Sequence, residues 1–239
     1  MNKRVVVLID GQNLFYGLQH IGLKERDITW TKLFISFLEP NDELIRAYWF
    51  RPQRIQDGHL TAESIRNQIV YKKYNGCYSN YKSGNHSAID TNTLTSIEND
   101  AREVERWLHE QKTRFSNIEY NYDQLCLDNS DIEIVKKGIV KINPYQQEYN
   151  GEKGVDIALA VKMISLSVEN KCNKIILISG DYDYAEAINY VKNNMTKVQI
   201  VKLHKGYPPK NKNMSRDLSV LADKVIDLYE ADIRNNYLR

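Results

Sequence analysis

Two short apolar runs, each followed by a carboxylate, constrain the fold of this chain more than any other feature. Residues 5–9 are all apolar and mostly β-branched, and Asp10 follows them directly. Residues 175–178 are also apolar, and the tripeptide 179–181 (Ser-Gly-Asp) follows them. Runs of this kind are typical of strands that are buried on both faces of a parallel sheet.

Predicted strands alternate with predicted helices along most of the chain, which indicates an α/β fold with a mostly parallel central sheet and helices on both faces. The alternation favours a single domain over residues 1–239, with an insertion within 53–150. The predicted strands are 5–9, 44–50, 118–125, two short strands within 132–142 that turn at 136–138, 174–179 and, as the final strand, 197–203. The predicted helices are 14–20, 61–74, 89–112, a buried helix at 155–168, 184–194, and an amphipathic C-terminal helix at about 217–231.

Composition sets limits on the function but does not define it. Hydrophobic residues make up 42% of the 239 residues, enough for a substantial core, and the net charge of +2 does not by itself indicate a polyanionic partner. The three cysteines are far apart and lack the spacing of zinc ligands. Since no apolar run approaches the roughly 20 residues of a membrane span, we expect a cytoplasmic protein without membrane contact.

Four carboxylates are candidates for a shared site. Asp10 and Asp181 end two predicted strands, Asp183 follows two residues later, and Asp156 opens the apolar helix at 155–168. In open α/β sheets, ligands bind beyond the carboxyl ends of the strands. Like charges gathered there need a cation, and ligand sets made only of oxygen select Mg²⁺ or Mn²⁺ rather than zinc.

Each of these acids also has a purely structural interpretation. Asp156 fits the first turn of a helix, where the helix dipole favours an acid. Asp183 with Glu186 resembles a capping box, and Asn13 is a candidate cap for the helix that follows it. Asp10 is the hardest to explain in this way, because a charge on a strand buried on both faces needs a partner.

Three segments resemble the motifs of the NYN domain, the LabA-like branch of the PIN-like ribonucleases. They are residues 6–14 (VVLIDGQNL), 153–161 (KGVDIALAV) and 176–184 (ILISGDYDY), and they occur in the family's order and spacing. The resemblance extends from Lys3 to about Tyr229, and the middle of the chain matches poorly.

The resemblance implies a PIN-like, Rossmann-related fold and a metal-dependent ribonuclease that hydrolyses RNA with metal-activated water. Carried over by position, Asp10, Asp156, Asp181 and Asp183 are the metal-binding acids, and Asn13 and Ser179 support them by hydrogen bonds. This sequence departs from the family at Lys162, where an acid is usual, and at Glu186, where proline is common. Lys162 either weakens a second metal site or points to solvent.

Two stretches without acidic residues are candidates for contact with RNA. Residues 64–89 and 187–216 contain no Asp or Glu, and the first also interleaves tyrosines with cations. Cations neutralise phosphates, and tyrosine rings offer stacking faces for unpaired bases. A solvated surface with packed tyrosines is the alternative interpretation. The residues predicted to bind RNA are Lys72, Lys73, Tyr74, Tyr78, Lys82 and Lys205, and the second stretch also contains Lys210, Lys212 and Arg216.

Two functions therefore remain open from the sequence. The first is a Mg²⁺- or Mn²⁺-dependent ribonuclease acting on single-stranded or structured RNA. The second is an NYN-like module that binds RNA or a protein and has lost efficient turnover, which Lys162 favours. A phosphatase with an aspartyl nucleophile is excluded because Gln12 occupies the place of its second acid. A dinucleotide-binding enzyme is also excluded, because no G-x-G-x-x-G motif follows a strand. The sequence leaves the oligomeric state open, and a homo-oligomer is one of the alternatives.

Overall fold

The computed structural model describes residues 2–206 and 216–239, which form two compact units. The first unit contains Met1–Gln53, Tyr120–Gly138 and Gly154–Arg239, and the second contains Arg54–Glu119 and Ile139–Lys153. The second unit lies largely within the interval 53–150 where the sequence predicts an insertion. The prediction of one domain carrying an insertion stays a prediction.

A six-stranded parallel sheet forms the centre of the first unit, which confirms the predicted fold class. The strand order is β4-β2-β1-β7-β8-β9, and every neighbouring pair is parallel. The strands are β1 (Lys3–Asp10), β2 (Asp42–Arg51), β4 (Ile132–Lys136), β7 (Lys174–Ile178), β8 (Lys197–His204) and β9 (Lys224–Tyr229).

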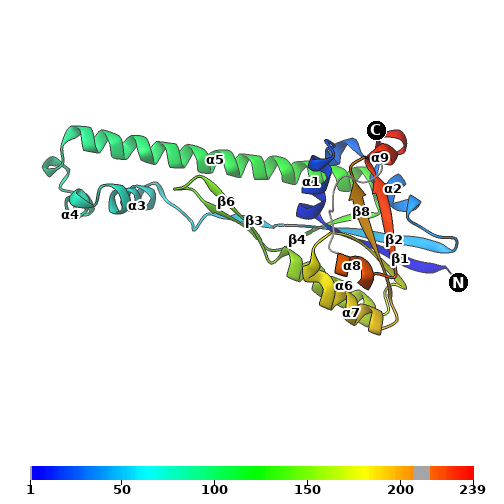
Figure 1. The fold of residues 1–239 in the computed structure, drawn as a ribbon. Coiled ribbons are helices and arrows are strands. Elements are labelled where there is room, and N and C mark those ends of the chain that lie inside the picture. The colour runs from blue at the N-terminus through cyan, green and yellow to red at the C-terminus, as the bar shows by residue number, and fades with distance from the viewer. Residues whose placement is uncertain (1, 207–215) are drawn as a thin grey trace. The chain divides into compact units, whose positions relative to one another are not determined.

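Successive side chains of the central strands point to opposite faces of the sheet and pack into two separate hydrophobic cores, one on each face. Val5, Val7 and Ile9 of β1 pack into one core, whereas Val6 and Leu8 pack into the other. The first core is covered by α1 (Gly11–His20), α2 (Trp30–Ser36) and α9 (Glu230–Asn236), and the second by α6 (Val155–Val168), α7 (Ala185–Asn193) and α8 (Arg216–Leu221) (Figure 1). Two short 3₁₀ turns, η1 (Glu25–Asp27) and η4 (Tyr182–Tyr184), complete this unit.

The second unit combines a small sheet with three helical segments. Its strands are β3 (Arg54–Gln56), β5 (Ile139–Asn143) and β6 (Glu148–Lys153), in the order β3-β5-β6. Its helices are α3 (Ala62–Lys73), α4 (Tyr78–Lys82) and the part of α5 (Thr91–Asp128) up to Glu119, with 3₁₀ turns η2 (Asn75–Cys77) and η3 (His86–Ala88).

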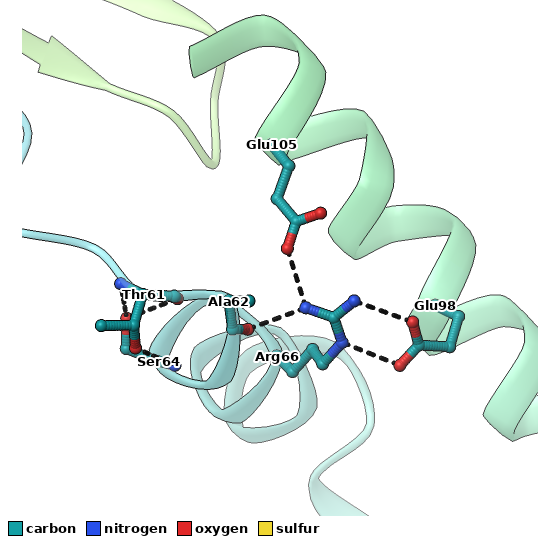
Figure 2. Close-up of polar contacts among 6 residues, drawn as sticks. All are labelled: Thr61, Ala62, Ser64, Arg66, Glu98 and Glu105. Carbon is teal, nitrogen blue, oxygen red and sulfur yellow. Dashed lines mark hydrogen bonds and ion pairs between the residues drawn. The ribbon is translucent and has the colours of Figure 1, made fainter. Parts of the chain in front are cut away.

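A partly buried arginine network joins α3 to α5. The guanidinium of Arg66 donates to both carboxylate oxygens of Glu98, at 2.8 and 2.9 Å, and to Glu105 at 2.8 Å (Figure 2). A capping box between Thr61 and Ser64 stabilises the first turn of α3, about one turn before Arg66 (Figure 2). Arg66, which lies in the first stretch without acidic residues, therefore serves the packing of this unit.

The strand predicted at 118–125 is wrong, because these residues continue α5. Alternate apolar residues suggested the strand, but Ile118, Tyr122 and Leu125 also recur at helical spacing. In the structure Tyr122 is buried whereas Tyr120 is exposed, as expected for a helix with one apolar face. Although α5 is 38 residues long, no helix among residues 2–206 and 216–239 has the combined length and apolar character needed to cross a bilayer.

The C-terminal helix predicted at 217–231 is also wrong, and β8 is not the final strand. Residues 224–229 form β9, which pairs in parallel with β8 from Lys224 opposite Gln199 to Tyr229 opposite His204. Asp223 fixes the start of β9, since its carboxylate and its amide both bond to the backbone of Val198. Pairing with the open edge of β8 therefore outweighs the helical periodicity of this segment.

Two other predictions need correction in part. Helix α6 has the predicted bounds, but Ile157, Val161 and Val168 are exposed, Ile157 by 70%, so it is buried on one side only. The two strands predicted within 132–142 exist, but β4 pairs with β2 whereas β5 pairs with β3 and β6. No cysteine among the described residues forms a disulfide.

A buried lysine anchors the amino ends of the strands. The side chain of Lys174 is 1% exposed, and its Nζ lies 2.5 Å from Asp42 and 2.8 Å from Glu39. Burial favours the neutral amine, but the hydrogen bonds and charges of Asp42 and Glu39 outweigh it and raise the pKa of Lys174. The hydrogen bonds from Lys174 and Lys224 lower the pKa of Glu39 to about 2.

Replacing Lys174 with methionine should lower the free energy of unfolding by about 3–5 kcal/mol, because Asp42 would remain buried without its cation. Urea unfolding at neutral pH measures this change, with exposed Lys171→Met as the control. The contribution of Glu39 is present above its ordinary pKa of 4.5 and is lost as the pH falls through about 2. The difference between parent and variant should therefore shrink in strong acid; a variant as stable as the parent at neutral pH contradicts the assignment.

Candidate active site

Asp10 lies at the junction of β1 and α1 and is 3% exposed. It caps α1, because its Oδ1 accepts the backbone N–H of Asn13 at 2.9 Å. Gly11 is required next to it, since a Cβ there would lie 2.5 Å from the carbonyl oxygen of Phe50 on β2. The interpretation of Asn13 as the helix cap is therefore wrong.

The turn after β7 is tied to the start of α1 by side-chain hydrogen bonds. The Ser179 hydroxyl donates to Oδ2 of Asp10 at 3.1 Å, and the Gly180 N–H donates to Oδ1 of Asn13 at 3.1 Å. Both contacts follow from the fold, because β1 and β7 are paired neighbours that end together. Asn13 and Ser179 therefore hold the start of α1 and the turn after β7 against each other.

The segment after Ser179 is also ordered by short-range hydrogen bonds. The N–H of Asp181 donates to the Ser179 hydroxyl at 3.1 Å, and the Asp181 carboxylate accepts the N–H of Asp183 at 3.0 Å. Asp181 therefore caps the 3₁₀ turn η4, and no capping box between Asp183 and Glu186 is present among these described residues.

Tyr184 links two of the predicted acids. Its hydroxyl lies 3.1 Å from Oδ2 of Asp10 and 3.3 Å from Oδ1 of Asp156, and the residue is 1% exposed. Burial and the charges of both carboxylates strongly raise the pKa of Tyr184, so the hydroxyl remains protonated. A single phenolic proton is thus shared between two carboxylates.

Asp156 occupies the first turn of α6 and its side chain is exposed to solvent. Gly154, which directly precedes α6, adopts φ of 85°, a left-handed conformation that glycine adopts without strain. Although the residue is exposed overall, the surrounding protein partly desolvates its carboxylate and so raises the pKa of Asp156, and the charges of Asp10, Asp181 and Asp183 raise it further. Asp10, Asp181 and Asp183 therefore lie close enough to Asp156 to influence its ionisation.

The ionisation of Asp10 is governed by opposing effects. Burial raises its pKa, and hydrogen bonds from Asn13, Tyr184 and Ser179 oppose that rise, while the charge of Asp181 reinforces it. In the described part of the chain, all hydrogen bonds to the Asp10 carboxylate come from neutral donors. Among the described residues, the Asp10 carboxylate therefore has no hydrogen bond from a cationic side chain.

The donor chemistry of this cluster fits a hard divalent cation, since every candidate ligand is an oxygen and the acids repel one another. Among residues 2–206 and 216–239, however, no three His, Cys, Asp or Glu side chains are already placed to hold one metal ion. Asp10 is fixed, whereas Asp156 and Asp183 are exposed and Asp181 is half-buried. The residues therefore fit a metal by chemistry and charge, and the ligand set is not fully assembled.

Lys162, the departure from the family's usual acid, lies on α6 with its Nζ 4.2 Å from the centre of the Tyr48 ring on β2. This is a cation–π contact, so Lys162 is held against the protein. Of the two alternatives, pointing to solvent is therefore wrong. Glu186 lies exposed in the first turn of α7.

Most of the residues predicted to bind RNA lie in the second unit. Lys73 and the Tyr74 hydroxyl both contact Asp100, at 3.0 and 3.1 Å. Exposed Lys72 lies over the ring of Tyr145 and exposed Lys82 over the ring of Tyr78. Lys205 lies in the first unit and donates to the carbonyl of His20 at 3.1 Å. Lys210 and Lys212, and the side chain of Arg216, lie outside the described residues.

Comparison with protein families identifies this architecture. The sequence matches the NYN domain family over residues 89–229, more than half of the chain. The chain belongs to the NYN family. NYN domains are PIN-like nucleases and are generally RNA-related, and PIN-like nucleases generally use divalent metals. The matched range contains Asp156, Ser179, Asp181 and Asp183 and begins after Asp10.

Comparison with individual proteins adds little. No curated protein matches the sequence. A crystal structure of a protein of unknown function from Vibrio parahaemolyticus RIMD 2210633 is similar with a TM-score of 0.48 and 14% identity. The similarity covers 100% of this NYN chain and 97% of that chain, and at this level it bears on neither fold nor function.

Tyr184 is a member of this side-chain cluster that the sequence did not assign to it. The sequence suggested only an aromatic residue at the start of a helix. A signal was available, since a buried tyrosine usually needs a hydrogen-bond partner for its hydroxyl, and Tyr184 directly follows Asp183.

Replacing Tyr184 with phenylalanine should raise the pKa of Asp10 further, because the hydroxyl now stabilises its charged form. Carboxyl-carbon NMR titration of metal-free protein measures this shift. Tyr190→Phe, which changes an exposed ring on α7, is the matched control. An unchanged titration of Asp10 in Tyr184→Phe is inconsistent with this hydrogen bond.

Proposed function

We propose that this NYN chain is a metal-dependent ribonuclease that hydrolyses RNA phosphodiester bonds. In this proposal Asp10, Asp156, Asp181 and Asp183 bind the metal ion. The observation that carries the proposal is the Asp10 carboxylate, 3% exposed, with hydrogen bonds in the described chain only from neutral donors. Three further acids raise the local negative potential. A divalent cation neutralises such a cluster and also gives it a function.

Each residue of the candidate site has a defined role in this proposal. Asp10 is the fixed metal ligand, and Asn13 and Ser179 are positioning residues that hold its carboxylate and the turn after β7. Asp156, Asp181 and Asp183 complete the ligand set, and the exposure of Asp156 and Asp183 leaves their side chains room to rotate toward the metal. When bound, Mg²⁺ or Mn²⁺ would activate water and stabilise the charge that develops on the displaced oxygen.

The substrate in this proposal is single-stranded or structured RNA. The exposed ammonium groups of Lys72 and Lys82, each beside a tyrosine ring, suit contact with phosphates and unpaired bases. Lys73 and Tyr74 support this surface through Asp100, and Tyr78 offers its ring beside Lys82. Lys205, which lies in the first unit, is a further cation proposed to contact the phosphates of the RNA.

A second candidate function is an NYN module that binds RNA without efficient turnover. The incomplete ligand set among the described residues and the cation at Lys162 favour it. Titrating Mn²⁺ into the protein with labelled RNA separates the two functions, because the binding module gives a complex without product.

Asp10→Asn should abolish Mn²⁺-dependent cleavage of labelled RNA, since it removes the fixed negative ligand. Ser179→Ala should lower activity by about 10- to 100-fold, as expected when a partner that orients a metal ligand is lost. Gel analysis of the cleavage products over time measures both effects.

Asp232→Asn, which changes an acid on α9, is the matched control and should cleave as the parent does. Circular dichroism establishes that each variant is folded. Equal cleavage by Asp10→Asn and the parent with saturating metal would exclude the hydrolytic proposal.

Replacing both Lys72 and Lys82 with alanine should weaken RNA binding and reduce its dependence on salt. Each phosphate contact to single-stranded RNA contributes about 0.7 to the slope of log affinity against log salt, so the slope should fall by about 1.4. Anisotropy titrations at several salt concentrations measure it. The control is Lys171→Ala with Lys197→Ala near the amino ends of β7 and β8; an equal change in both double variants argues against this surface.

A further inference from the structure

A pocket of about 250 Å³ opens in the first unit beside the acidic cluster. Helix α1 forms one side of it, and the carboxyl-end regions of β7 and β8 form the other. Its volume lies just below the roughly 300–1,000 Å³ of pockets that hold drug-sized ligands. The pocket therefore has room for one small planar group rather than for a helix or a folded partner.

The lining of the pocket combines apolar walls with a polar and aromatic rim. Leu14, Val201 and Leu203 supply apolar surface, and Tyr16 lies at the rim with 53% of its surface exposed. Lys202 adds a cation from β8. A nucleobase has apolar faces and polar edges, so it matches a pocket with apolar walls and polar groups at its opening. The exposed ring of Tyr16 offers a surface on which such a base can stack.

The absence of a side chain at Gly17 helps to define this pocket. A Cβ at Gly17 would lie 2.8 Å from Cδ1 of Leu203, so α1 and β8 approach each other closely there. A larger residue at position 17 would push Leu203 and alter the wall that they share.

The pocket is continuous with the candidate active site. Asn13 and Ser179 line the pocket and also hold the Asp10 carboxylate and the turn after β7. A ligand in the pocket therefore lies next to the group that the acids would act on. The cation of Lys202, which lines the pocket, suits a polyanionic chain that continues past a base, whereas an isolated neutral ligand would not need it.

We propose that this pocket receives one unpaired base of the RNA strand whose phosphodiester bond lies at the acidic cluster. The inference rests on the proposed ribonuclease function and deepens it, because it names a substrate feature: a nucleotide that is out of any duplex beside the cleaved bond. Tyr16 stacks on the base, and Lys202 lies beside the adjoining phosphate.

The test is a comparison of two labelled single-stranded hexaribonucleotides, one intact and one with abasic positions that keep the same backbone charge. Binding is measured by fluorescence anisotropy in EDTA at one fixed salt concentration, so that no cleavage occurs. Tyr16→Ala should weaken affinity for the intact RNA by about 5- to 100-fold, the range expected for loss of one stacked base, and should leave affinity for the abasic RNA unchanged. Tyr16→Phe should bind as the parent does.

Tyr190→Ala, which removes an exposed ring from α7, is the matched control and should change neither affinity. The pocket proposal is overturned if Tyr16→Ala binds the intact RNA as the parent does, if it loses affinity equally for both RNAs, or if the parent binds neither RNA. A parallel cleavage assay with Mn²⁺ separates the two proposals. Cleavage without any effect of Tyr16→Ala overturns the pocket alone, whereas base-dependent binding without cleavage overturns the ribonuclease alone.

Discussion

The burial of the Asp10 carboxylate is the constraint on which the rest of this structure depends. An acid that is 3% exposed remains in a folded protein only if hydrogen bonds and charge compensate for lost hydration. The N–H of Asn13 and the hydroxyls of Ser179 and Tyr184 supply the hydrogen bonds, and each comes from a different element. Stabilising one carboxylate therefore fixes the relative positions of α1, the turn after β7 and the turn before α7.

The two ends of the parallel sheet solve the same electrostatic problem differently. At the amino ends, the carboxylate of Asp42 is buried against the ammonium group of Lys174, so charge is compensated within the protein. At the carboxyl ends, Asp10 meets only neutral donors in the described chain, and Asp156 and Asp181 add further negative charge nearby. The first arrangement contributes to stability, whereas the second leaves a negative potential that suits a divalent cation.

The centre of the fold could be predicted from the sequence because its strands are recognised from residues that are neighbours in the chain. Continuous apolar runs identify β1 and β7, and parallel neighbours must end at the same edge, so Asp10 and Ser179 could be brought together without coordinates. The C-terminal segment failed for the opposite reason, since β9 exists only because β8 offers an open edge. Similarly, the contact of Lys162 with Tyr48 and the sharing of the Tyr184 hydroxyl depend on tertiary packing that no spacing of residues reveals.

Diffraction from crystals soaked in Mn²⁺, with data collected at the manganese absorption edge, tests the central claim most directly. An anomalous peak ligated by the Asp10 carboxylate and by at least one of Asp156, Asp181 and Asp183 is the predicted result. Crystals that bind manganese only elsewhere, or not at all while Asp10 keeps its hydrogen bonds from Ser179 and Tyr184, would contradict a metal-dependent active site at this edge of the sheet.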